Sequence, residues 1–184
     1  MFDFTRLYKN VLNQQTCDTI INMFESSPEE HEERNINDYI KFTELNINKN
    51  PQKWGDLIEY FLYLCKEYTK DYKEHFGIDE HQFPNTYAFE EIRIKKYLPN
   101  DFHEFKLHVD VQNKESAKRY LSFLFYLNNV EIGGETTFGR EDEIIIKPEM
   151  GNLLMFPPLW TNIHTGKKPI SGPKYIITTY NEYI

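Results

Sequence analysis

Two histidines and one aspartate are the residues whose types and spacing best support metal chemistry. His108 and Asp110 are separated by a single residue. If they end a strand, side chains two residues apart point to the same side, so the imidazole and the carboxylate converge. A third ligand must come from elsewhere, and His164 follows two predicted strands that can return it beside this pair. Two neutral imidazoles and one carboxylate on one side of a metal ion leave three coordination positions open.

Each of these residues also has an ordinary structural explanation. A strand-end histidine can hydrogen-bond to a neighbouring acid, which would account for His108 beside Asp110, and a loop histidine such as His164 can cap a turn. The other histidines have no comparable spacing, and we expect them to be surface or core residues: His31, His75, His81 and His103.

Lys174 favours a metal and ligand site over the ordinary structural explanations. It stands ten residues after His164 and opens the apolar run 175–180. A lysine that begins a buried strand loses hydration and needs an anionic partner. The far carboxylate of a dicarboxylic acid would provide one through a charge-assisted hydrogen bond. The alternative is a lysine that protects an edge strand against unwanted pairing.

The elements that must position these residues follow from hydrophobic periodicity. Apolar residues recur at three-to-four spacing over 13–26, with Asn13 as a possible cap, and over 51–76, where Asn50 and Pro51 mark a start and Gly77 an end. Both stretches predict amphipathic helices. Short β-branched or aromatic runs separated by Asn, Gly and Pro then predict strands over 88–98, 119–127, 143–147, 153–156 and 174–180. The polar segment 29–50 predicts a loop with a strand near 39–45.

Helices followed by strands indicate an α+β fold, in which a double-stranded β-helix (jelly-roll) barrel carries N-terminal helices packed on one sheet. The 184 residues fit one domain, with helical support over about 1–80 and a barrel over about 84–184. Fourteen Phe and thirteen Tyr residues predict an interior rich in aromatic rings.

Composition narrows the possible partners and compartment. The formal net charge of −8 disfavours a surface that follows a nucleic-acid backbone. The cysteines, Cys17 and Cys65, both fall in helical patterns and predict reduced, buried thiols. Neither a signal peptide nor a membrane span is recognisable, so we expect a soluble cytoplasmic protein.

The stretch 97–178 resembles the catalytic barrel of 2-oxoglutarate- and iron(II)-dependent dioxygenases, most closely their prolyl 4-hydroxylase branch. The family pattern of His-x-Asp, a distant His and a Lys or Arg stands here as His108, Asp110, His164 and Lys174. The resemblance implies Fe(II) on the first three residues and the C5 carboxylate of 2-oxoglutarate on Lys174. It also implies O2 as cosubstrate, ascorbate as reductant, and succinate and CO2 as products.

Further matches to the family surround this pattern. Tyr126 resembles a tyrosine that shares the cosubstrate carboxylate, and Thr178 a nearby hydroxyl. Tyr97 resembles a tyrosine that lines the cofactor pocket, and the Gly-Gly-Glu-Thr sequence of 133–136 resembles a family turn that places Thr136 near the cosubstrate. Each of these also has an explanation as a core or turn residue.

Several features bear on the substrate and on the reaction. Arg119 matches an arginine that reaches the substrate peptide in prolyl hydroxylases, which implies a peptide or protein partner. Tyr180 stands where those enzymes commonly keep a tryptophan beside the target proline, so the aromatic wall differs in size. Asp110 fills the position that halogenating relatives leave small, which implies hydroxylation. The interval from Tyr97 to His108 is longer than usual, and 100–101 replaces the glycine normally found there.

The function expected from this resemblance is hydroxylation of a prolyl residue in a peptide or protein. Two alternatives stay open. One is a hydroxylase of another amino acid or of a nucleic-acid base, although the acidic charge and the single lysine, in place of a pair of arginines after His164, count against a base. The other is a catalytically silent jelly-roll binding module. The sequence does not predict the oligomeric state.

Overall fold

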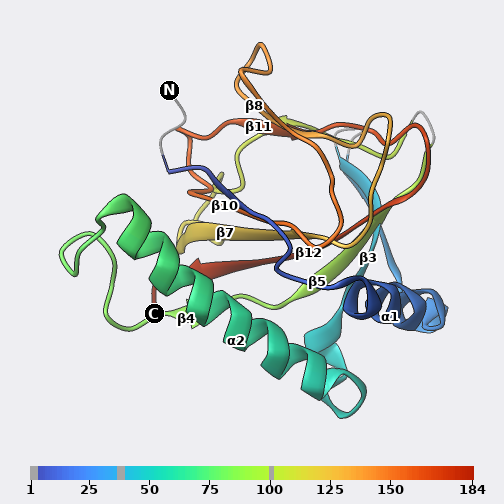
Figure 1. The fold of residues 1–184 in the computed structure, drawn as a ribbon, viewed down its shortest axis with the longest axis horizontal. Coiled ribbons are helices and arrows are strands. Elements are labelled where there is room, and N and C mark those ends of the chain that lie inside the picture. The colour runs from blue at the N-terminus through green and yellow to red at the C-terminus, as the bar shows by residue number, and fades with distance from the viewer. Residues whose placement is uncertain (1–3, 37–39, 100–101) are drawn as a thin grey trace.

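A curled antiparallel β-sheet with two helices on one face makes up the protein, as seen in a computed structural model that describes residues 4–36, 40–99 and 102–184 (Figure 1). Its helices are α1 (Gln14–Glu25) and α2 (Pro51–Phe76), with 3-10 turns at Pro28–Glu30 and Ile47–Lys49. Its strands are β1 (Arg6–Tyr8), β2 (Glu32–Ile36), β3 (Ile40–Asn46), β4 (Ala88–Phe89), β5 (Arg93–Tyr97), β6 (Phe105–His108), β7 (Arg119–Tyr126), β8 (Thr136–Phe138), β9 (Ile144–Ile146), β10 (Leu153–Phe156), β11 (His164–Gly166) and β12 (Lys174–Glu182).

The strand order explains how distant residues meet. The sheet runs β1-β10-β7-β12-β5-β3-β6-β11-β8-β9, with β2 beside β3 and β4 beside β12. Strand β11 pairs antiparallel with β6, and in this register His164 lies opposite His108. The two histidines are therefore cross-strand neighbours, although 55 residues separate them in the chain.

Local signals set the helix ends where the sequence predicts them. The Asn13 side chain accepts a hydrogen bond of 2.9 Å from the Thr16 N–H and so caps α1. Helix α2 begins at Pro51 and ends before Gly77, whose φ of 64° is left-handed. Both predicted helices are confirmed. In the described ranges, no helix combines the length and the apolar character that a membrane crossing requires.

Alternation along the strands separates an outer core from the barrel interior. On neighbouring strands, Phe125 and Ile177 belong to the outer core that the helices cover. The ring of Phe61 from α2 packs edge-on against Phe125, with centroids 4.9 Å apart. The residues adjacent to these on the same strands, Tyr126 and Ile176, belong to the interior cluster. Successive side chains of a strand point to opposite faces, so each strand supplies both layers.

Four short strands were not predicted. Strands β1, β8 and β11 have three residues each, too few to show a period, and the five residues of β2 are mostly polar or charged. The strand expected near 39–45 is confirmed as β3, although residue 39 lies outside the described residues. Because β1 and β3 join the sheet, the segment expected to give helical support over about 1–80 also contributes strands. The domain division itself stays a prediction.

Both cysteines are buried and free, as predicted. Burial raises the pKa of the Cys17 thiol to about 11, so the thiol stays protonated near neutral pH.

Candidate metal centre and active site

Three metal-ligating groups meet at the paired ends of β6 and β11. One ligand atom from each of His108, Asp110 and His164 lies within 4.8 Å of the other two. The Oδ1 atom of Asp110 is 3.2 Å from Nε2 of His108 and 3.7 Å from Nε2 of His164. Adjacent ligands about 2.1 Å from a metal ion lie roughly 3 Å apart, so small side-chain movements would bring these atoms to coordinating positions.

Backbone carbonyls orient both imidazoles. Nδ1 of His108 is 2.6 Å from the carbonyl oxygen of Lys106, and Nδ1 of His164 is 2.9 Å from that of Asn162. Because a carbonyl oxygen only accepts, each Nδ1 must carry the proton, which leaves Nε2 of a neutral ring free to coordinate. The ring of Phe105 stacks on His108 with centroids 3.4 Å apart and further restricts its rotation.

Burial and charge favour the coordinating protonation states. Burial alone would raise the pKa of Asp110, but attraction to His164 and the interaction with His108, whose Nε2 lies 3.2 Å from Oδ1, hold it well below its usual range. Burial lowers the pKa of His164 to about 4, with the Asp110 charge opposing the shift. At neutral pH the site therefore offers a carboxylate anion and a neutral His164 imidazole, which are the forms that bind a divalent cation.

Lys174 lines the same cavity as the three ligands. Its side chain lies over two rings, with Nζ 5.6 Å from the centroid of Tyr97 and 5.6 Å from that of Tyr126. Within the described part of the chain, no carboxylate stands at ion-pair distance from it. Burial lowers the pKa of Lys174 to about 7, and the charge of Glu135 opposes this only in part. Lys174 is thus a buried cation that is available to pair with an anionic ligand.

Two hydroxyl groups and a glycine turn lie beside Lys174. The Tyr126 hydroxyl donates a 2.8 Å hydrogen bond to Oγ1 of Thr136. Gly133 and Gly134 precede Thr136 with φ of 78° and 76°. A Cβ on Gly133 would lie 2.5 Å from the carbonyl oxygen of Lys168, so only glycine fits there.

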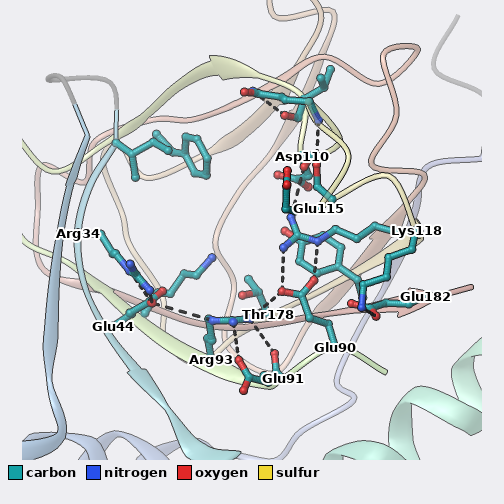
Figure 2. Close-up of a pocket in the computed structure, with 18 of the residues that line it drawn as sticks. Arg34, Glu44, Glu90, Glu91, Arg93, Asp110, Glu115, Lys118, Thr178 and Glu182 are labelled. Atoms are coloured by element: carbon teal, nitrogen blue, oxygen red, sulfur yellow. Dashed lines mark hydrogen bonds and ion pairs between the residues drawn. The ribbon is translucent and has the colours of Figure 1, made fainter. Parts of the chain in front are cut away.

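A groove of about 750 Å³ adjoins the metal centre (Figure 2). Asp110, Thr178 and Tyr180 line both the groove and the buried cavity, so the two spaces share a wall. Ion pairs occupy the sides of the groove: Arg34 with Glu44, Arg93 with Glu90 and Glu91, Lys118 with Glu182, and Arg119 with Glu90.

Arg119 is held at the junction of groove and metal centre. Its Nε and Nη2 atoms donate to the two carboxylate oxygens of Glu90 over 2.5 and 2.8 Å, and Nη1 donates to the backbone carbonyl of Asp110 over 3.3 Å. The guanidinium carbon lies 4.3 Å from the centroid of the Tyr180 ring. Arg119 therefore braces the residues beside the metal ligands, and its role toward a substrate stays a prediction.

Nine of the ten predicted site residues line these two spaces, and the tenth, Tyr126, contacts Lys174 and Thr136 behind the cavity wall. The structure adds three residues that the sequence did not indicate. Phe105 stacks on a ligand, Glu90 anchors Arg119, and Lys95 lines both the cavity and the groove. Alternation from Tyr97 along β5 points to Lys95, whereas no local signal marks Glu90. His103, which the sequence places outside the site, is buried and accepts a hydrogen bond from the Leu98 N–H over 3.2 Å.

The curled antiparallel sheet thus brings together two imidazoles and one carboxylate, a donor set suited to a divalent metal ion. The family model of the 2OG-Fe(II) oxygenase superfamily matches residues 92–182, which are 91 of the 184 residues of the chain. The family predicted from the sequence is therefore confirmed.

Similar proteins lie in the prolyl 4-hydroxylase branch. Prolyl 4-hydroxylase 13 of Arabidopsis thaliana is 27% identical over 144 residues, which cover 67% of this chain and 48% of that protein. The chain thus spans about half the length of this curated relative. A viral collagen prolyl hydroxylase of Paramecium bursaria Chlorella virus-1, solved with 2OG, superposes with a TM-score of 0.71 at 20% identity, covering 99% of this chain and 97% of that one.

A prolyl hydroxylase of Trichoplax adhaerens, solved with a hypoxia inducible factor peptide fragment, gives a TM-score of 0.74 at 18% identity, covering 98% of this chain and 84% of that one. At such identities these structures establish the shared fold.

Proposed function

We propose that this chain is a 2-oxoglutarate- and O2-dependent hydroxylase of a peptide or protein, with a prolyl residue as the target. The observation that carries the proposal is that three metal ligands and the cation Lys174 line one and the same buried cavity, next to an open groove. A double-stranded β-helix is the arrangement we infer for the curled sheet around this cavity.

The donor set fits a ferrous ion. Nε2 of His108, Nε2 of His164 and a carboxylate oxygen of Asp110 would hold it on one side, and two imidazoles with one carboxylate are the ligands typical of non-haem Fe(II) oxygenases. When bound, iron supplies the activation of O2, by which one oxygen atom enters a substrate C–H bond and the other oxidises 2-oxoglutarate to succinate and CO2. The chain's own contribution is to orient the reactants and exclude water.

Lys174 would bind the C5 carboxylate of 2-oxoglutarate. Its ammonium donates in a cavity where an anion replaces lost hydration, and Tyr126 adds a hydroxyl to the same region. Tyr97 and Thr136 would form the wall around the cosubstrate, and Thr178 would face it further along β12. These aromatic and hydroxyl groups shield the charged end of the cosubstrate from bulk water.

The groove is the proposed binding site for the peptide. Tyr180 would present its ring beside the target residue, and Arg119 would steady that ring through the cation–π contact. A buried phenol provides a flat apolar surface suited to a proline ring. Ascorbate is proposed as the reductant that keeps iron ferrous.

A peptide panel tests this proposal. The protein is incubated with Fe(II), ascorbate, O2 and 2-oxoglutarate, and peptides with and without proline are analysed by mass spectrometry alongside succinate release. We expect proline peptides to gain one oxygen in proportion to succinate formed. A gain on peptides without proline would reject the prolyl target but support the cofactor assignment. Binding of metal and 2-oxoglutarate without any succinate would indicate a silent binding module instead.

The affinity for 2-oxoglutarate should fall as pH rises. Lys174 has a pKa of about 7 before the anion binds, so above that pH binding must take up a proton. We expect Kd to rise about tenfold between roughly pH 6.5 and 8. Calorimetry on the protein loaded with Mn(II), which does not turn over, measures this effect. Lys174→Arg is the matched control, because an arginine stays charged and should give a flat profile. A wild-type profile equally flat would contradict the prediction.

A further inference from the structure

Lys95 lies at the boundary between the groove and the metal cavity and has no acidic partner in the described part of the chain. It lines both spaces. Among the described residues that line the groove, every other lysine or arginine forms an ion pair with a glutamate, and Lys95 alone has no carboxylate at ion-pair distance. The positive charge available to a groove ligand is therefore concentrated beside the metal centre.

Strand geometry directs the Lys95 side chain inward. Lys95 shares its face of β5 with Tyr97, which lines the cavity. The next residue, Lys96, points to the opposite face, where its Nζ forms a 2.7 Å ion pair with Glu25 of α1. Nζ of Lys95 lies 5.0 Å from the ring centroid of Phe42, which forms an apolar wall. Lys95 is thus half-buried against an aromatic ring and faces the groove and the metal cavity.

The surroundings of Lys95 leave its charge uncompensated. Burial lowers its pKa, and the charges of Glu44 and Asp110 only partly oppose this, while Arg93 and Arg119 reinforce it. Glu44 is already paired with Arg34 over 2.7 Å. A metal ion would neutralise Asp110, which removes one of the two attractive charges. A carboxylate brought by a ligand would then provide the hydrogen-bonding partner that this ammonium lacks.

We propose that Lys95 binds a carboxylate of the substrate, so that the preferred targets carry an aspartate or glutamate beside the hydroxylated residue. This inference rests on the proposed function, because it takes the groove to be the peptide site. It makes Lys95 a specificity-determining residue: an acidic neighbour is attracted by the ammonium of Lys95, whereas a basic neighbour is repelled by it.

Matched peptides test this inference. Two peptides contain a central proline flanked by Glu or by Gln and are otherwise identical. Their Kd values are measured by fluorescence anisotropy on the protein loaded with Mn(II) and 2-oxoglutarate, and kcat/KM is measured with Fe(II). We expect the Glu peptide to bind about tenfold more tightly than the Gln peptide, as for a charged hydrogen bond. Lys95→Met should bring the ratio close to one, whereas Lys96→Met, on the opposite face, should preserve it.

Each other outcome has a defined meaning. Equal binding of the two peptides to the wild-type protein overturns the inference, as does loss of the preference in Lys96→Met, because the effect would then be one of overall charge. A Lys95→Met variant that keeps the peptide preference but binds 2-oxoglutarate more weakly would place Lys95 in the cosubstrate site and also overturn it. A Lys95-dependent binding preference without turnover supports carboxylate recognition while rejecting the hydroxylase, so the two proposals fail separately. Lys95→Gln repeats the test if the methionine variant unfolds.

Discussion

The variant Asp110→Asn is expected to lose ferrous-ion binding and all measurable hydroxylation. The substitution keeps the shape of the side chain but removes the anionic ligand, which leaves two neutral imidazoles and an amide to offset the cost of dehydrating a divalent cation. We expect metal affinity to fall at least about a hundredfold. Calorimetric titration with Fe(II) without oxygen, together with the succinate assay, measures both effects.

A surface aspartate provides the control for this experiment. Asp142→Asn removes the same charge from a residue whose Oδ2 atom pairs with Nζ of Lys167 over 2.9 Å, outside the cavity and the groove. This variant should bind metal as the wild type does. If Asp110→Asn retained wild-type affinity, iron would have to be held by other residues, and the proposed centre would be wrong.

The sequence correctly predicts those parts of the site whose geometry depends on residues close together on one strand. The interval of two between His108 and Asp110 lets both ligands reach the same side of the β6 end. Lys174, Thr178 and Tyr180 lie at even spacing on β12 and line the same cavity. Such relations depend on the two-residue period of an extended chain and need no knowledge of distant partners.

Other features depend on pairing between distant segments, which a single sequence does not encode locally. The register that sets His164 opposite His108 arises from strands of three and four residues. Glu90 appears only as part of an acidic pair in the sequence, yet it fixes Arg119, 29 residues further along. The partners that neutralise the groove cations are equally distant, so the unpaired state of Lys95 is visible only in the fold.

In the N-terminal half of the chain, too, local features were predicted from the sequence and long-range features were not. Capping by Asn13 and termination at Gly77 are local and were predicted correctly. The contribution of β3 to the centre of the sheet, between β5 and β6, is a long-range property. Its polar sequence gives little indication that Glu44 is buried beside the groove, because the arginine that compensates this charge comes from the neighbouring strand β2.

The variant Lys174→Met is expected to bind 2-oxoglutarate more weakly and yet to be more stable against unfolding. Removal of the ammonium eliminates the anchor for the C5 carboxylate, so Kd for 2-oxoglutarate should rise at least about a hundredfold, the loss typical of a buried charged hydrogen bond. The cosubstrate-free protein should nevertheless become more stable, by about 2 kcal/mol, because an apolar side chain of similar length replaces a buried cation that has no ion-pair partner among the described residues. Calorimetry and urea unfolding measure the two effects on the same preparation.

The pH dependence of unfolding distinguishes this explanation from a general packing effect. The folded pKa of Lys174, about 7, lies below the ordinary value of 10.5, so between these pH values the folded protein binds fewer protons than the unfolded chain. The free energy of unfolding of the wild type should therefore gain a contribution from Lys174 that grows as pH rises from about 7 toward 10.5. Lys174→Met lacks this contribution, so its advantage should be largest below about pH 7 and shrink as pH rises. An advantage independent of pH would show that packing, and not the buried charge, determines the stability of this site.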